Sequence, residues 1–282
     1  MKADTGTRRR PANDAELQAI ANAFVEARLN ARPLRDYPGK IPADLDTAYR
    51  CQDIAIELWP DEVAGWKVGR IPPEIENQFA SDRLAGPIFR RTIHRSDSDQ
   101  ILELPVFAGG FAAIEAEFVV VVGGEVPPDK LQWSRAEARQ LMGDLCIGIE
   151  MASSPLKSIN DLGPAVIASD FGNNAGLIVG PSIAQWRSRK LESMTCEAFI
   201  DGKSVGRGSA FNLTGGPLRS LQFILELAAK RGQALKAGDV IATGQTTGIH
   251  DIECGQSGRI EFGHDGALSC KAIEAQGLVQ VD

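Results

Sequence analysis

Three glutamates beside strongly apolar segments are the residues of this chain best suited to chemistry. Glu115 and Glu117 stand one residue apart just before the apolar run 118–122, and Glu150 ends a second apolar stretch, residues 145–149. Side chains two residues apart on a β-strand point to the same face, and so apolar and β-branched a run is typical of a buried strand. The spacing therefore predicts two carboxylates on one inward-facing surface.

Clustered buried carboxylates need a partner. Two unit negative charges roughly 4 Å apart repel by about 4 kcal/mol at an effective dielectric near 20, so the group must take up a proton or bind a cation. Ligands that are all carboxylates suit Mg²⁺ or Mn²⁺, whereas Zn²⁺ favours histidine or cysteine. The spacing alone equally allows Glu115 and Glu117 to face solvent on an edge strand, with Glu150 ending its strand at the surface.

Composition excludes several classes of function. The chain carries 37 acidic against 30 basic residues, a net charge of -7, and no basic stripe interleaved with aromatic residues, so we expect no nucleic-acid partner. No apolar run approaches the ~20 residues of a membrane span. The five cysteines are scattered without a C-x-x-C pair, which favours reduced thiols. We therefore expect a soluble, cytoplasmic protein without a membrane partner.

The N-terminal third has the pattern of helices. Asn13 and Glu16 form a capping-box pattern ahead of apolar residues at helical spacing, which predicts a helix over 14–29. A second helix is predicted over 44–58. We expect residues 1–12 to be a disordered tail and residues 13–100 to form a small helical N-terminal region.

From residue 101 onward, short apolar runs alternate with turns. Asp201-Gly202 and Asp265-Gly266 lie between apolar segments and predict hairpins. Two helices interrupt this pattern, one after the capping box of Ser134 and one over 218–230. We expect residues 101–282 to form a mainly β catalytic domain, as a barrel, roll or sandwich, and the whole chain to be α+β.

Six segments, taken in order and with their spacing, carry a family resemblance. The chain resembles the 2-oxopent-4-enoate hydratase and 2-oxohex-3-enedioate decarboxylase family, within the fumarylacetoacetate hydrolase superfamily. The segments are residues 65–69 (GWKVG), 114–118 (IEAEF), 147–150 (IGIE), 206–209 (GRGS), 216–218 (GPL) and 235–244 (LKAGDVIATG).

The resemblance implies a mixed β-roll like the C-terminal domain of fumarylacetoacetate hydrolase, preceded by a smaller helical region, in a homo-oligomer. It implies that Glu115, Glu117 and Glu150 bind Mg²⁺ or Mn²⁺, with Lys67 beside the metal. The cation would stabilise negative charge on the 2-oxygen of a 2-oxo acid substrate. A glutamate at 150, where the related hydrolases tend to have an aspartate, favours the hydratase and decarboxylase branch.

The resemblance is weaker around the general acid or base. Asp82 lies near the position where family members often carry an aspartate, and the stretch 169–175 offers Asp170 and Asn174. Each of these is a candidate catalytic residue, beside Lys67. Asp and Asn are also common in turns, so each could serve a purely local role.

Four further residues are candidates for binding substrate. Arg70 follows the lysine motif, and its guanidinium could hold a second carboxylate, although it could equally be a surface arginine. Gln245, Thr246 and Thr247 lie in a glycine-bounded loop that offers an amide and hydroxyls to a carboxylate. The same loop could be an ordinary hairpin tip.

The sequence therefore predicts a metal-dependent hydratase that adds water to a 2-hydroxypenta-2,4-dienoate-type acid in meta-cleavage of aromatic compounds. Three alternatives stay open: a decarboxylase of 2-oxo-3-hexenedioate, an acylpyruvate-type C–C hydrolase, and a non-catalytic homologue with structural carboxylates.

Overall fold

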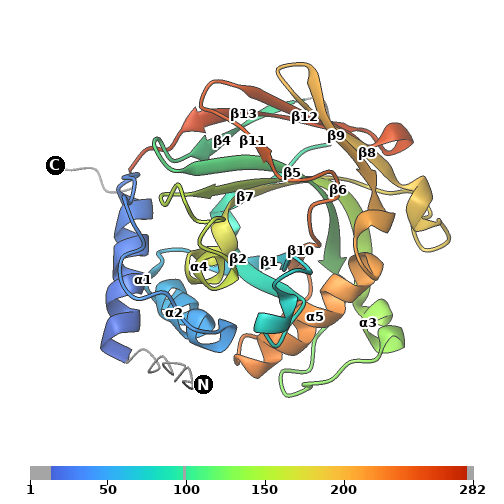
Figure 1. The fold of residues 1–282 in the computed structure, drawn as a ribbon. Coiled ribbons are helices and arrows are strands. Elements are labelled where there is room, and N and C mark those ends of the chain that lie inside the picture. Colours follow the sequence, from blue (N-terminus) through green and yellow to red (C-terminus); the bar gives the residue numbers. More distant parts are fainter. Residues whose placement is uncertain (1–13, 98–99, 278–282) are drawn as a thin grey trace, which may run out of the picture.

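Two β-sheets and five α-helices make up the computed structural model, which describes residues 14–97 and 100–277. The expected tail, residues 1–12, and Asn13 lie outside the described residues. Figure 1 shows the smaller sheet lying over one side of the larger, curled sheet, with the helices around the opposite side. The fold is α+β, as the sequence predicted. Among the described residues, no helix combines the length and apolar character that a membrane crossing requires.

The larger sheet contains the segments that carry the candidate residues. Its strand order is β2-β1-β10-β5-β6-β7-β3, with β11 also paired to β5. These strands are β1 (Val63–Arg70), β2 (Arg83–Phe89), β3 (Ile93–Arg95), β5 (Phe111–Val122), β6 (Met142–Ser154), β7 (Asn174–Ser182), β10 (Val240–Ala242) and β11 (His250–Asp251).

The smaller sheet has the strand order β4-β13-β12-β8-β9. Its strands are β4 (Ile101–Val106), β8 (Thr195–Ile200), β9 (Lys203–Ser209), β12 (Ser257–Glu261) and β13 (Ala267–Glu274). Asp201-Gly202 connects β8 to β9, and Asp265-Gly266 lies between β12 and β13, so both predicted hairpins are confirmed.

Strand β5 is buried on both faces, which explains its unbroken apolar sequence. Phe118 points toward the smaller sheet and packs edge-to-face on Phe262, with ring centroids 5.7 Å apart. Val119, on the opposite face, belongs to a separate apolar cluster with Ile88 and Val179. Glu115 and Glu117 share the face of Val119 because side chains alternate along a strand. The prediction of an inward-facing carboxylate pair is therefore confirmed.

The predicted helices are present. Helix α1 spans Asp14–Leu29, and α2 spans Leu45–Leu58 with Asp44 as its N-cap, whose side chain accepts from Thr47 N. Helix α3 (Arg135–Leu141) begins with the expected capping box of Ser134, and α5 spans Gly216–Lys230.

One helix was not predicted. Helix α4 (Pro164–Ser169) follows Gly163 and carries proline at its first position. The expectation of only two helices after residue 101 is therefore wrong. Six residues make fewer than two turns, which is too short for an apolar pattern of helical period to be visible.

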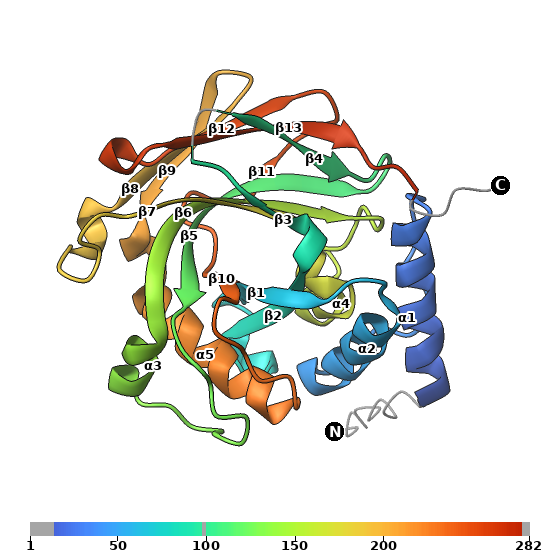
Figure 2. The same ribbon diagram turned by 180° about the vertical axis from the view of Figure 1, so that it is seen from behind.

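The expected N-terminal region contributes strands to the larger sheet. β1, β2 and β3 all precede residue 100, and β1 pairs in parallel with β10 while β2 pairs with β1. Figure 2, the view from behind, shows β1 and β2 inside the curl of this sheet beside α4. Residues 13–100 are thus not only helical, and the larger sheet extends across the expected boundary at residue 100.

Candidate active site

The three glutamates lie together on neighbouring strands. Glu115 and Glu117 come from β5, and Glu150 comes from β6, directly opposite Glu115 in the strand register. Each carboxylate offers an oxygen within 4.8 Å of the other two. Glu115 is 4% exposed and the other two are fully buried. The alternative of solvent-facing carboxylates is thereby excluded.

The hydrogen bonds of this triad leave oxygens available for a cation. Glu117 Oε2 accepts from Gly244 N at 2.8 Å, and Glu150 Oε1 accepts from Asn174 Nδ2 at 2.9 Å. The other oxygens of these two carboxylates, Glu117 Oε1 and Glu150 Oε2, are buried without a hydrogen-bond partner. Buried polar atoms are normally satisfied. Three buried carboxylates with two unpartnered oxygens fit the ligand set of a hard divalent cation.

Without a cation the triad holds its negative charge at a high cost. Burial raises the pKa of Glu115 to about 7, although Lys67 acts in the opposite direction. Burial, together with Glu150 and Glu115, raises the pKa of Glu117 well above its usual value. Desolvation and like charge both favour the protonated forms of Glu115 and Glu117, and a bound cation would favour their ionised forms.

Lys67 is buried against the triad. It lies on β1 and is 4% exposed, with Nζ 3.5 Å from Glu150 Oε1, and it donates a hydrogen bond to Asn173 Oδ1 at 3.0 Å. Burial by itself lowers the pKa of Lys67, but Glu150, Glu115 and Glu117 outweigh it and raise the pKa above its usual value. Lys67 therefore places a positive charge beside the carboxylates.

The segment that supplies Asn173 has an unusual backbone. Phe171, Gly172 and Asn173 are three consecutive residues with φ of 51°, 64° and 58°. We call this segment the left-handed turn. A positive φ is uncommon outside glycine and is an outlier for a bulky residue such as Phe171, at a cost on the order of 1–3 kcal/mol for each strained residue. The surrounding structure must therefore hold the turn in place.

The left-handed turn packs tightly on β2 and on Lys67. A Cβ at Gly86, which pairs with Lys67 across β1 and β2, would lie 2.0 Å from Phe171 O. A Cβ at Gly172 would lie 2.9 Å from Gly86 Cα and 3.1 Å from Lys67 Cδ. Two glycines thus permit the close approach that brings Asn173 to the lysine ammonium group.

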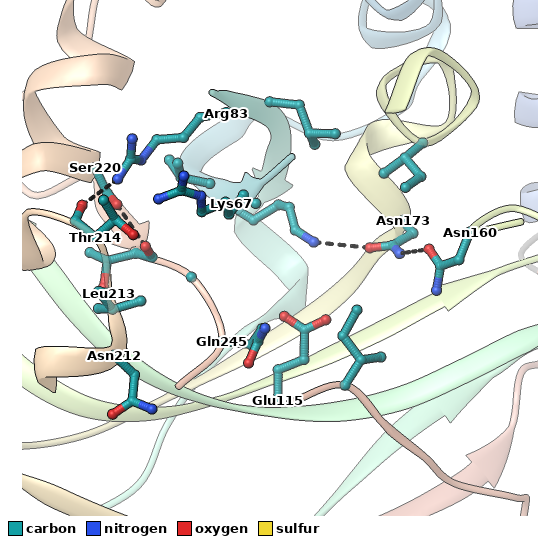
Figure 3. A pocket seen from close by; sticks show the side chains of 18 residues that line it. Lys67, Arg83, Glu115, Asn160, Asn173, Asn212, Leu213, Thr214, Ser220 and Gln245 are labelled. Carbon is teal, nitrogen blue, oxygen red and sulfur yellow. Dashed lines mark hydrogen bonds between the residues drawn. The ribbon is translucent and has the colours of Figure 1, made fainter. Parts of the chain in front are cut away.

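A cavity of about 160 Å³ opens beside Lys67 and Glu115 (Figure 3). Arg70, Arg83 and Gln245 also line it, whereas Glu117 and Glu150 do not. The cavity wall therefore contains one carboxylate, one ammonium group and two guanidinium groups. Such a space suits a small anion better than an apolar ligand.

Sequence comparisons identify relatives among enzymes of 2-oxo acid metabolism, while no protein-family model matches the chain. A 4-oxalocrotonate decarboxylase from a Pseudomonas species is 32% identical over 108 residues, which are 38% of this chain and 40% of that protein. A 2-keto-4-pentenoate hydratase from Burkholderia vietnamiensis is 23% identical over 239 residues, covering 82% of this chain and 88% of the relative.

The relatives that the chain resembles are thus named 2-keto-4-pentenoate hydratase and 4-oxalocrotonate decarboxylase. The first name denotes the 2-oxopent-4-enoate hydratase and the second the 2-oxohex-3-enedioate decarboxylase, so the resemblance inferred from the six segments is confirmed. A solved structure of the 4-oxalocrotonate decarboxylase from Pseudomonas putida G7, complexed with magnesium and adipate, has the same fold: the TM-score is 0.75 at 20% identity, over 94% of this chain and all of that one.

Two residues that the sequence offered as a catalytic acid or base lie away from the cavity wall. Asp82 forms ion pairs with Arg83 and Arg219 and lines a separate groove between α2 and α5. Asp170 is 1% exposed, and its carboxylate binds Arg28 and Ser154. We therefore leave both aspartates out of the proposed reaction.

The loop after β10 contributes one residue to the cavity wall and two residues that hold the loop in place. Gln245 lines the cavity, and its side-chain oxygen accepts from Gly248 N. Thr246 is buried, and its hydroxyl donates to the carbonyl oxygen of Ala116 at 2.9 Å. The hydroxyl of Thr247 is hydrogen-bonded to His250 at 3.0 Å. The two threonines therefore hold the loop on β5 and β11, and only Gln245 is placed to meet a ligand.

Sequence reasoning chose Asn174 for the catalytic set and missed Asn173 and Arg83. Asn174 donates to Glu150, whereas Asn173 contacts Lys67 and lines the cavity. The signal for Asn173 was present in the doubled asparagine of the stretch 169–175. Arg83 carried no such signal, because its place in the cavity follows only from its pairing with Arg70 across β1 and β2.

Proposed function

We propose that the protein is a divalent-metal-dependent hydratase that adds water to a 2-hydroxypenta-2,4-dienoate-type 2-oxo acid, a reaction of aromatic meta-cleavage. The observation that carries this proposal is a buried carboxylate triad with two unpartnered oxygens beside a buried lysine, at a small cavity. The relatives named as hydratases over most of their length support the choice of reaction.

Glu115, Glu117 and Glu150 would hold Mg²⁺ or Mn²⁺. When bound, the cation supplies Lewis-acid stabilisation for negative charge on the 2-oxygen of the substrate. The three carboxylates exceed the charge of a divalent ion by one, and the ammonium group of Lys67 balances that excess. An anionic substrate therefore meets a site without net negative charge.

Lys67 is also the residue placed to move a proton. Conversion of the dienol to its 2-oxo form carries a proton to the distal carbon, and addition of water at C4 again needs an acid or base. Among the described residues that line the cavity, the ionisable groups are Lys67, Glu115 and the two arginines. Arginine stays protonated, and Glu115 is proposed as a metal ligand, so we assign the proton transfer to Lys67.

The test is a product assay on the purified protein. It is incubated with 2-hydroxypenta-2,4-dienoate and with 2-oxohex-3-enedioate, with Mg²⁺ or with chelator, and products are identified by mass. Gain of water on the first compound, only with metal, supports the hydratase. No reaction with either compound would contradict the proposal and favour an acylpyruvate hydrolase or a non-catalytic homologue.

A specific observation favours a second candidate, the decarboxylase of a 2-oxo-enedioic acid. Arg70 and Arg83 face each other directly across β1 and β2, and both line the cavity. Burial lowers the pKa of Arg83 below its usual value; Asp82 opposes this shift, and Arg219 and Arg70 add to it. Like charges directly opposite on a sheet are unfavourable. Asp82 and Glu76 already pair with these two arginines, and a second substrate carboxylate would reduce the repulsion further. Loss of CO₂ from 2-oxohex-3-enedioate would establish this candidate.

A further inference from the structure

The buried ion pair between Arg28 and Asp170 joins helix α1 to the left-handed turn. Arg28 Nε donates to Asp170 Oδ1 at 2.5 Å, and its Nη2 donates to Oδ2 at 2.9 Å. The side chains are 4% and 0% exposed, and the two residues are 142 positions apart in the sequence. Ser154 donates a further hydrogen bond to the same carboxylate at 2.6 Å.

Arg28 contacts the turn on both of its sides. Its Nη1 donates to Asn174 O at 3.0 Å, the residue directly after the turn, while Asp170 directly precedes it. The guanidinium group also lies over the ring of Phe171, 5.2 Å from the centroid. One side chain thus binds both ends and the first residue of a segment whose backbone is strained.

The turn and the residue that follows it each supply one contact to the proposed site. Asn173 accepts from Lys67 Nζ, and Asn174 donates to Glu150. Figure 3 shows Asn173 reaching Lys67 on one side and Asn160 on the other. A shift of the left-handed turn would therefore move the partners of the ammonium group and of one carboxylate together.

Stability alone does not account for this arrangement. Replacing a buried ion pair by apolar residues of similar volume is often neutral or favourable, so such a pair is weak grounds for a stabilising role. A planar guanidinium group, in contrast, fixes several acceptors in one geometry. Arg28 binds the carboxylate of Asp170 and the carbonyl oxygen of Asn174 at the same time, as a residue that positions the turn must do.

We propose that Arg28 and Asp170 are positioning residues: by fixing the left-handed turn, they set Asn173 on Lys67 and Asn174 on Glu150. This inference rests on the proposed metal-dependent function. Helix α1, which contributes no residue to the cavity, would then control the metal ligand Glu150 through the turn.

The test is the affinity for Mn²⁺, measured by calorimetry without any substrate. Loss of a group that orients a metal ligand typically lowers metal affinity 10–100-fold. We expect Arg28→Met and Asn174→Ala each to raise the Kd for Mn²⁺ by about 10-fold or more. The double variant should bind no more weakly than the weaker single variant, because both substitutions break the same connection.

Two further variants keep the test decisive. Ile20→Ala removes a fully buried side chain from the same helix without touching the ion pair, and should bind Mn²⁺ like the wild type. Arg28→Met leaves the charge of Asp170 buried without its partner and could prevent folding. In that case the double variant Arg28→Met/Asp170→Asn, which removes both charges, takes the place of Arg28→Met in the comparison with Asn174→Ala.

The outcomes separate the two proposals. Wild-type affinity in the variants that lack Arg28, or losses that multiply in the double variant, would overturn this inference alone. A wild-type protein that binds no Mn²⁺ would overturn the proposed function together with it. With substrate, the same variants should lose kcat while Ile20→Ala keeps it.

Discussion

Glu115 lies directly opposite Glu150 across the β5–β6 ladder, so that two carboxylates face each other in the interior of the sheet. Like charges in this position are destabilising. Lys67 contributes one positive charge, and the unpartnered oxygens of Glu117 and Glu150 leave room for a cation to contribute the rest. The stability of the protein should therefore depend on metal.

Glu117→Gln should abolish stabilisation by metal. Saturation at about 100 times the Kd adds roughly 2.7 kcal/mol to the free energy of unfolding, which corresponds to a rise in Tm of about 5 °C or more for a chain of this size. We expect this shift with Mg²⁺ or Mn²⁺ in the wild type, and no shift in the variant. Glu103→Gln, at an exposed position on β4, is the matched control. Identical Tm values with metal and with chelator in the wild type would contradict the metal site.

Lys67→Met should stop turnover while the protein still folds. The role proposed for this lysine is electrostatic balance and proton transfer, and removal of such a group typically lowers kcat by about 10²–10⁴-fold. Steady-state kinetics at saturating metal, with circular dichroism as a check on folding, measures both effects. Lys236→Met, at an exposed position, should keep full activity. A fully active Lys67→Met protein would refute the assignment.

Gly86→Ala should displace the left-handed turn. The added methyl group would lie 2.0 Å from Phe171 O, and backbone atoms cannot yield cheaply. We expect a loss of about 1–3 kcal/mol in the free energy of unfolding, as is usual for overpacking, together with weaker Mn²⁺ binding. Gly124→Ala is the matched control, because its methyl group would meet only Leu141 Cδ2 at 3.7 Å. Equal denaturation midpoints for the two variants would contradict the close contact between Gly86 and the left-handed turn.

Arg70→Ala should alter the preference among substrates if the second carboxylate binds there. Arg70 is partly exposed and pairs with Glu76 at 3.1 Å, so its removal costs little stability. We expect KM for a 2-oxo-enedioic acid to rise by about 10-fold or more, the loss of one charge-assisted contact, with little change for a monocarboxylate. Arg91→Ala, on the surface, serves as the control. An unchanged substrate profile would remove Arg70 from the substrate site.

Glu137→Gln should weaken the capping box of α3 in a pH-dependent way. Hydrogen bonds from Lys130 and Ser134 lower the pKa of Glu137 to about 2. A lowered pKa in the folded state contributes stability above the unfolded value, near 4.5, and that contribution disappears as the pH falls toward 2. The difference in denaturation midpoint between wild type and variant should therefore be largest above pH 5 and smaller at pH 3. A difference that grows on acidification would contradict this.

Local patterns were enough to predict the carboxylates and most helices. Glu115 and Glu117 follow from the period of two along a strand, and α3 follows from its capping box. The ion pair of Arg28 with Asp170 could not be predicted, because it joins residues 142 positions apart that meet only in the folded chain. The role of Asn173 depends likewise on a backbone conformation that tertiary contacts impose on its segment.

The position of β10 in the larger sheet affects the order in which the sheet can form during synthesis. This strand, residues 240–242, inserts between β1 and β5 and so separates the lysine strand from the strand with two of the glutamates. During synthesis, the ribosome releases β1 and β5 long before the segment that must lie between them. Lys67 can consequently take its final place beside the triad only after residue 242 has been made, so the lysine that balances the charge of the three glutamates is the last part of the site to be positioned.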